Sequence, residues 1–314
     1  LEKTDSLPQN ILCLTFTESG ALNMRERLTR FVGQAAYDVT ISTYHAFGAD
    51  ILRRFPQYFT EHRLENPIDE LGKHQIVSTI VENMSYVNPL KQTRHHLGDL
   101  IATISEIKRA LLSSDDLRAI ASENIMFLRA ISKGMKPLFA EFTRMPGTFA
   151  KASVPFTELL HLLNEHVPAQ AANKRFGSLA EIAADSLAAA LHEAEETNKS
   201  KPLTAWKNLW LAKNEDNEFI MDGQLMNARI AALADVFEAY QAALKAGGLY
   251  DFDDMIIRAI HALETHNDLK YTLQEQYLYL LLDEFQDTNA AQLQLVALLT
   301  DHPVNNGRPN IMGV

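Results

Sequence analysis

Cysteine is almost absent from this chain, because Cys13 is the only one among 314 residues. A framework of disulfides within the chain is therefore excluded, and a reducing compartment suits the composition. No apolar run reaches the roughly 18 residues that a membrane-spanning helix needs. The sequence shows no secretion signal, in which a charged segment, an apolar segment and a stretch of small residues would follow one another. We expect a cytoplasmic protein that has no membrane partner.

Basic residues are also scarce, because 29 lysines and arginines stand against 40 acidic residues and give a net charge of −11. A broad basic surface for nucleic acid is thereby excluded. The deficit is uneven: residues 1–60 carry six basic and six acidic groups, whereas residues 251–301 carry two basic and ten acidic ones. Any grip on DNA must be local, through stacking and backbone amides, or must use parts outside this chain.

A glycine-rich phosphate loop is missing as well. The Walker A pattern G-x-x-x-x-G-K-[ST] would supply backbone donors and a lysine for the phosphates of ATP. The only Gly-Lys pair is Gly72-Lys73, which is followed by His74, and Pro67 stands where the first glycine belongs. We therefore expect this chain alone neither to bind ATP tightly nor to hydrolyse it.

The most informative feature that is present is the segment YLYLLLDEFQDTN at residues 277–289. Its apolar run, residues 277–282, has the length of a strand that helices cover on both faces of a parallel sheet. The run ends at Asp283 and Glu284, and two carboxylates there are costly unless a cation compensates them. Because ligands of open α/β sheets bind at this carboxyl edge, the pair predicts a site for magnesium and a nucleotide. The alternative is a solvated strand end.

Two strand-and-helix units are expected near the amino end. Residues 11–17 have the pattern of a strand, and a helical pattern follows them. Residues 39–43 are expected to form the strand of a second unit, whose helix stops at Pro56. Two later strands and the helix between them are expected at residues 277–283, 310–314 and 290–300. The fold class is therefore α/β with a parallel sheet. Residues 67–248 show helical spacing of apolar side chains with almost no alternating pattern, which predicts a helical insertion.

Four motifs carry a family resemblance. Residues 283–289, DEFQDTN, resemble motif II of the UvrD/Rep/PcrA helicases, whose usual form is DExQDTN. Residues 11–28 resemble motif Ia, TFTNKAAxEMxxRL, and depart from it at Glu18, Ser19 and Gly20. The other two resemblances are to motif Ib, TxHSF, and to the DFDDL element before motif II, at residues 41–55 and 250–255. The four matches follow the family order and bracket nearly the whole chain.

The resemblance implies part of a RecA-like motor domain of the P-loop NTPase type, interrupted by a large all-helical subdomain. Its parts would be residues 1–62 with motifs Ia and Ib, residues 63–248 as the inserted subdomain, and residues 249–314 with motif II. It also implies a piece of a longer protein, with the phosphate loop upstream of Leu1 and the completing arginines downstream of Val314.

The function that the resemblance implies is that of an ATP-dependent DNA helicase. ATP hydrolysis with Mg²⁺ would drive movement along single-stranded DNA in the 3′-to-5′ direction and unwind duplex junctions, in repair or recombination and with partner proteins of those processes. Asp283 would be the Walker B ligand of the magnesium ion that ATP carries. Glu284 would orient or deprotonate the attacking water, and Gln286 would couple the nucleotide site to the DNA side.

DNA contacts are implied for the turns that follow the first two strands. The residues are Thr15, Phe16 and Thr17 in the first turn, and Thr43, Tyr44, His45 and Phe47 in the second. Hydroxyls and free amides at the start of a helix suit a phosphate oxygen, and an aromatic ring suits a base. Spacing alone is equally compatible with purely structural roles: Phe16 as a core residue, Thr17 as a helix cap, and His45 as a capping histidine.

Three alternatives remain open on the sequence. One is the helicase subunit of a helicase–nuclease of the RecB or AddA type, and another is a non-catalytic module that binds single-stranded DNA or other proteins. The third is a hydrolase with two metal ions held by Asp251, Asp253, Asp283 and Glu284. The acids near residue 251 equally fit a helix start, with Asp251 as the cap of a helix over residues 252–262.

Overall fold

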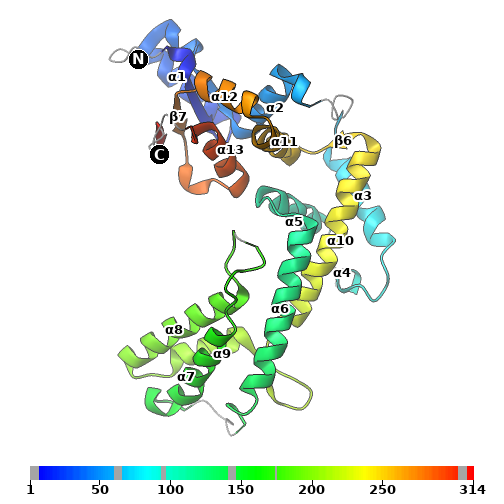
Figure 1. Cartoon of the computed structure of the whole chain (residues 1–314), viewed down its shortest axis with the longest axis vertical. Coiled ribbons are helices and arrows are strands. Elements are labelled where there is room, and N and C mark those ends of the chain that lie inside the picture. Colours follow the sequence, from blue (N-terminus) through cyan, green and yellow to red (C-terminus); the bar gives the residue numbers. More distant parts are fainter. Residues whose placement is uncertain (1–6, 60–65, 93–96, 141–145, 174, 303–309) are drawn as a thin grey trace. The chain divides into compact units, whose positions relative to one another are not determined.

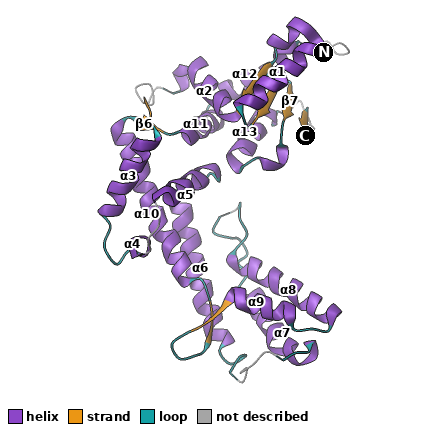
Figure 2. Ribbon diagram, turned by 180° about the vertical axis from the view of Figure 1, so that it is seen from behind, coloured by secondary structure: helices purple, strands orange, loops and turns teal. Residues whose placement is uncertain are grey.

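The computed structural model describes residues 7–59, 66–92, 97–140, 146–173, 175–302 and 310–314 (Figure 1). The chain divides into two compact units. The first unit contains Leu1–Glu82, His96–Leu112 and Ala239–Val314, and the second contains Asn83–His95 and Ser113–Glu238. Helices make up most of both units (Figure 2).

The first unit is built on a parallel sheet of four strands in the order β2-β1-β7-β8. The strands are β1 (Ile11–Thr15), β2 (Thr40–Thr43), β7 (Tyr279–Leu282) and β8 (Ile311–Gly313). The predicted α/β class and parallel sheet are therefore confirmed. Each strand is somewhat shorter than its predicted range, because the flanking residues cap helices or form turns.

The first unit also contains several helices, most of which pack around these strands. They are α1 (Glu18–Val32), α2 (Tyr44–Arg54), α3 (Glu70–Glu82), α5 (Leu97–Arg109), α11 (Phe252–Thr265), α12 (Asn267–Gln276) and α13 (Ala290–Thr300). A short parallel pair, β3 (Asn66–Pro67) with β6 (Leu249–Tyr250), adds to this unit. The helix predicted at residues 290–300 has the same bounds as α13, and the one predicted at residues 252–262 extends to Thr265.

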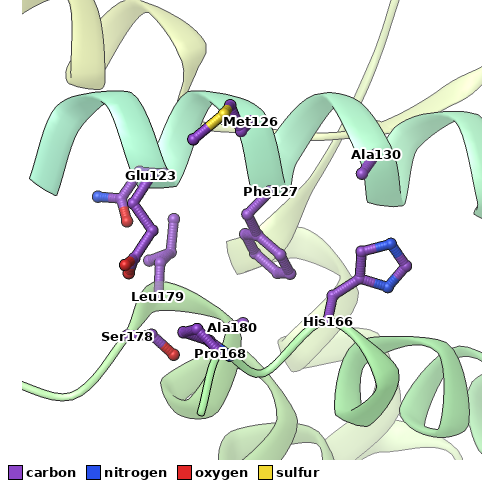
Figure 3. Close-up of a pocket in the computed structure, with 10 residues that line it drawn as sticks. Glu123, Met126, Phe127, Ala130, His166, Pro168, Ser178, Leu179 and Ala180 are labelled. Carbon is purple, nitrogen blue, oxygen red and sulfur yellow. The ribbon is translucent and has the colours of Figure 1, made fainter. Parts of the chain in front are cut away.

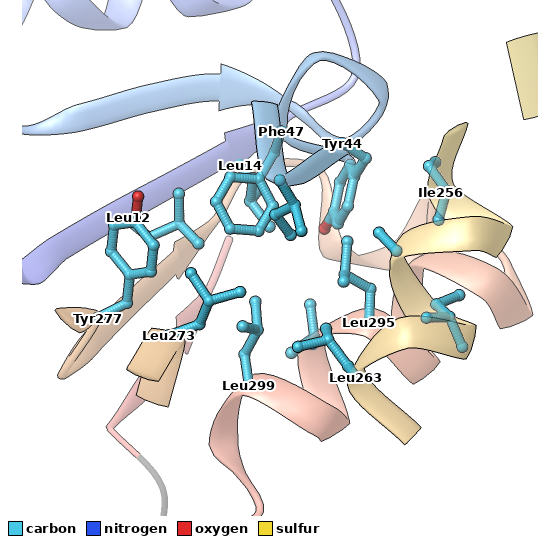
Figure 4. Packing of buried hydrophobic residues seen from close by; sticks show 14 of the residues in the cluster. Leu12, Leu14, Tyr44, Phe47, Ile256, Leu263, Leu273, Tyr277, Leu295 and Leu299 are labelled. Atoms are coloured by element: carbon cyan, nitrogen blue, oxygen red, sulfur yellow. The ribbon is translucent and has the colours of Figure 1, made fainter. Parts of the chain in front are cut away.

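Both faces of the sheet are covered. On one face, leucines of β1 and β7 pack against α2, α11, α12 and α13, as Figure 4 shows for Leu12, Leu14, Tyr44, Phe47, Ile256, Leu263, Leu273, Leu295 and Leu299. On the other face, a smaller cluster joins Cys13, Ala21, Val39 and Ile41. Burial raises the pKa of the Cys13 thiol to about 11, so this lone cysteine is an inert core residue.

The second unit is helical with one hairpin. Its elements are α4 (Pro89–Gln92), α6 (Ser114–Met135), α7 (Phe149–Glu165), α8 (Leu179–Thr197), α9 (Lys201–Trp210), β4 (Leu211–Lys213), β5 (Phe219–Met221) and most of α10 (Gln224–Gly247). Phe156, Leu187 and Trp206 lie in its core. The antiparallel hairpin β4–β5 was not predicted, because strands of three residues are too short to show an alternating pattern.

No helix within the described residues is both long enough and apolar enough to span a bilayer.

Candidate functional site

Asp283 lies at the carboxyl edge of the sheet, beside the first strand-to-helix turn. Its backbone amide donates a hydrogen bond of 2.9 Å to the carbonyl of Leu14, which continues the pairing of β7 with β1. The hydroxyl of Thr15 donates to Asp283 Oδ2 over 3.1 Å. Thr15 is buried, so this bond fixes one carboxylate oxygen. The sheet thus brings together residues that are 268 positions apart in the chain.

Glu284 follows in a left-handed backbone conformation, with φ of 52°. That conformation costs a residue other than glycine about 1–2 kcal/mol, and such strain gathers at functional sites. The side chain is exposed, and Gln286 Nε2 donates to Glu284 Oε2 over 2.5 Å. The backbone of Glu284 therefore departs from the direction of the strand, and the Glu284 side chain is held by its hydrogen bond with Gln286.

The oxygen atoms at this edge of the sheet fit a hard cation such as Mg²⁺ that takes its other ligands from a bound nucleotide and water. Asp283 Oδ1 accepts no hydrogen bond within the described residues, and carboxylate oxygen is the ligand that Mg²⁺ prefers. The buried Tyr44 hydroxyl also has no partner there, and burial with the nearby charge of Asp283 raises its pKa to about 12. No group of three His, Cys, Asp or Glu side chains in the described part of the chain could hold a metal ion. An ion at Asp283 would accordingly take most of its ligands from phosphate and water.

The first turn is organised by helix capping. Thr17 is the N-cap of α1, and its hydroxyl accepts a hydrogen bond of 2.9 Å from the amide of Gly20. Phe16 is half-buried, packs against the core, and has its ring centre 5.7 Å from that of Tyr44. The structural roles that spacing allows, a cap for Thr17 and a packing residue for Phe16, are therefore both present. Thr17 remains exposed and Phe16 partly so.

Gly20 stands where the usual form of motif Ia has alanine, and its surroundings in this turn are crowded. A Cβ atom there would lie 2.7 Å from Thr15 Oγ1 and 3.0 Å from Thr17 Oγ1. A side chain at this position therefore requires a small shift of Thr15, which bonds Asp283, or of Thr17, which caps α1. Sequence reasoning did not find this constraint, because the clash arises only when strand and helix are folded together.

The second turn is linked to the first. Thr43 caps α2 by accepting from the amide of Ala46 over 3.2 Å, and its own hydroxyl donates to Glu18 Oε1 over 3.2 Å. Tyr44 and Phe47 are each only 1 % exposed and belong to the core. Side chains without accessible surface cannot stack on a base, so the predicted DNA contact is corrected for these two: they pack α2 against the sheet.

His45 points toward α11 instead. Its ring stacks on that of Phe252, with centres 3.9 Å apart and planes inclined by 19°. Its Nε2 atom lies 3.7 Å from Asp253 Oδ1, beyond ordinary hydrogen-bond length. His45 is therefore not the capping residue of its turn, because Thr43 has that role.

The acids near residue 251 form a helix start with basic partners. Asp251 caps α11 by accepting from the amide of Asp254. Lys108 contacts both Asp251 and Asp254, and Arg109 contacts Asp253. Burial acts to raise the pKa of Asp253, but the polar contacts from His45 and Arg109 prevail and hold it at about 2.

The hydrolase with two metal ions is thereby rejected, because Asp251 and Asp253 are neutralised by Lys108 and Arg109 and join no metal-binding group within the described residues. Lys108 had one signal in the sequence, since it interrupts the apolar stripe of its helix at a position that should be buried.

A separate cavity of about 240 Å³ lies in the second unit and contains none of the predicted site residues (Figure 3). Met126 and Phe127 of α6 line it together with Pro168, and its polar side chains include Glu123 and His166. Its lining is mainly apolar and brings together no nucleophile with a base, so we assign it no chemistry.

Comparison with known proteins supports the motif assignments. The sequence profile described as "UvrD/REP helicase N-terminal domain" matches residues 1–312. A probable DNA helicase of Mycoplasma pneumoniae is 44 % identical over 91 residues, which is 29 % of this chain and 16 % of that protein. The ATP-dependent DNA helicase PcrA of Leuconostoc citreum is 35 % identical over 114 residues, 35 % of this chain and 15 % of that protein.

A longer match is to the ATP-dependent DNA helicase PcrA of Staphylococcus epidermidis, which is 24 % identical over 301 residues. That match includes 96 % of this chain and 26 % of the relative. The chain thus spans about a quarter or less of the length of the curated relatives it matches.

Proposed function

Because the chain belongs to the UvrD/REP helicase N-terminal domain family, we propose that it forms part of the motor of an ATP-dependent DNA helicase. In that protein, ATP hydrolysis would drive 3′-to-5′ movement on single-stranded DNA and the opening of duplex junctions during repair or recombination. The observation that carries this proposal is the contact between Thr15 and Asp283, which joins the turn of motif Ia to the acid of motif II.

On the nucleotide side, Asp283 would hold the magnesium ion of ATP through its unbonded Oδ1, while Thr15 keeps the carboxylate from rotating. The bound ion and nucleotide would supply the phosphoryl group and neutralise its developing charge. Glu284 would accept a proton from the attacking water or orient it. Gln286 would set the direction of the Glu284 carboxylate through their hydrogen bond.

On the DNA side, we assign direct contacts to the predicted residues of the two turns that keep some accessible surface, which are Phe16, Thr17 and His45, the last with a side chain 16 % exposed. Phe16 offers a ring edge for a base, and Thr17 with the free amides of α1 suits a phosphate. Four residues would act indirectly, because all of them are buried and hold the turns in place: Thr15, Thr43, Tyr44 and Phe47.

Two further parts of the proposal concern the extent of the chain. Residues 63–248 would form the inserted subdomain, between motor segments 1–62 and 249–314. This chain alone should give no ATPase signal above background, because its sequence lacks the phosphate loop. A measurable rate from the purified 314-residue chain would contradict that expectation.

The decisive experiment uses the longer protein that contains this chain. Glu284→Gln should lower the DNA-stimulated ATPase kcat by at least about 100-fold, the range seen when a group acting in the transition state is removed. Binding of single-stranded DNA should stay within about twofold of wild type. The exposed Asp301→Asn serves as control, since it removes a carboxylate outside the motif. Full ATPase activity in Glu284→Gln would refute the proposed role, and a protein without DNA-stimulated ATPase would favour the non-catalytic alternative.

A further inference from the structure

Lys108 is a buried cation in a chain that buries few charges. Its side chain is 1 % exposed, and Nζ lies 2.6 Å from Asp251 Oδ2 and 2.7 Å from Asp254 Oδ1. The hydroxyl of Tyr240 donates to the same Asp251 oxygen over 3.1 Å. Because removing an ammonium group from water is expensive, such a cluster persists only with close partners, which it has here.

The next residue extends the contact to the third acid. Arg109 Nε lies 3.0 Å from Asp253 Oδ1. The last turn of α5 therefore binds all three carboxylates at the start of α11. That same start presents Phe252 and Asp253 to His45, the first by ring stacking and the second at 3.7 Å.

Helix capping alone does not explain this arrangement. The backbone amides of Asp251 and Asp254 are already satisfied by the reciprocal bonds between these two residues, and neither bond needs Lys108 or Arg109. A buried ion pair also adds little net stability compared with apolar residues of the same volume, whereas it does impose one geometry. The close packing of α2 against α11 also indicates that one geometry is imposed here, since a Cβ on Gly48 would lie 3.0 Å from the carbonyl oxygen of Met255.

We propose that Lys108 and Arg109 are positioning residues for single-strand binding: by fixing the start of α11 they hold Phe252 and Asp253 against His45, and so set the direction of the His45 ring. This inference rests on the proposed function, because it assumes that His45 contacts DNA. It adds a residue pair on α5 that lies outside all four motifs.

The test uses the longer protein that contains this chain, with three variants that carry different risks to folding. Arg109→Gln removes the exposed partner of Asp253, Asp253→Asn keeps the shape of the side chain, and Lys108→Met removes the buried charge. Arg109→Lys is the rescue variant, because it retains a cation. Arg118→Gln is the matched control, since Arg118 forms an ion pair with Asp235 in the second unit.

Three measurements are made on each variant: affinity for a fluorescent oligo-dT strand, the ring signals of His45 by NMR with labelled histidine, and thermal unfolding. We expect Arg109→Gln and Asp253→Asn to weaken oligo-dT binding by about 5- to 20-fold and to shift the His45 signals, because the ring current of Phe252 changes. Arg109→Lys should stay within about twofold of wild type, and Arg118→Gln should change neither affinity nor the His45 signals.

The outcomes separate the inference from the proposed function. If His45→Ala weakens binding but Arg109→Gln and Asp253→Asn do not, the inference is overturned and the function stands. If the variants lower only the unfolding temperature, with His45 signals and affinity unchanged, the contacts are structural and the inference is again overturned. If the wild-type protein binds oligo-dT and His45→Ala binds it equally tightly with an unchanged unfolding temperature, the DNA-side proposal for His45 fails and the inference fails with it. Should Lys108→Met not fold, the other two variants still decide the question.

Discussion

Gly20 is tightly constrained by its neighbours at the candidate site. Alanine normally stabilises a helix by about 1 kcal/mol relative to glycine. In Gly20→Ala the new Cβ would meet Thr15 Oγ1 at 2.7 Å, and Thr15 is buried and bonded to Asp283. Overpacking of this kind costs about 1–3 kcal/mol. We expect a net loss of up to about 2 kcal/mol in the free energy of unfolding, measured by urea denaturation.

Gly98→Ala provides the comparison, because it is the same substitution in α5 with nothing within 4 Å of the new Cβ. It should stabilise the chain by up to about 1 kcal/mol. Gly20→Ala equal to or more stable than wild type would show that Thr15 moves aside freely, and would weaken the claim that its hydroxyl holds Asp283.

Residue types and residue environments were not equally predictable. The predicted parallel strands account for the position of Asp283 beside Thr15, because the carboxyl ends of parallel strands share one edge of the sheet. The sequence motif did not indicate that Tyr44 and Phe47 face the core. A motif records which side chains occur at a turn, whereas their exposure depends on how α2 rotates onto the sheet.

The secondary-structure elements show what could be predicted from the sequence and what could not. The helix α13 was placed to the residue, while the hairpin β4–β5 left no pattern. The attachment of α5 to α11 was also invisible, because Lys108 and Asp251 are 143 positions apart and a lysine in an apolar stripe does not name its partner. Local periodicity thus predicts the elements, and buried charges decide how some of them join.

The start of α11 should respond to acid through Asp253. Its pKa is about 2 in the folded chain against an ordinary 3.8. The ionised carboxylate therefore stabilises the fold above about pH 5, and that contribution is lost as pH falls through about 2. Between these values the unfolding free energy of wild type, followed by circular dichroism, should fall more steeply than that of Asp253→Asn. Parallel curves for the two proteins would mean that Arg109 and His45 do not favour the charged form.

The chain has two compact units, and its two tryptophans lie in only one of them. Trp206 and Trp210 both belong to the second unit, where Trp206 packs with Phe156. Tryptophan fluorescence should therefore report the unfolding of the second unit, while far-ultraviolet circular dichroism reports both units. If each core is cooperative by itself, the two probes should give different urea transitions in the wild-type chain.

Two core truncations turn this into a strict test. Phe156→Ala should cost about 3–5 kcal/mol and move the fluorescence transition to lower urea. Leu280→Ala, in the core beneath the sheet, should cost about 2–5 kcal/mol and move only the part of the dichroism signal that fluorescence does not follow. If both substitutions instead shift both probes together, the chain unfolds as a single cooperative unit, and the helices of the second unit depend on the sheet for their stability. Independent shifts would show that the α/β unit and the helical unit each derive their stability from their own buried side chains.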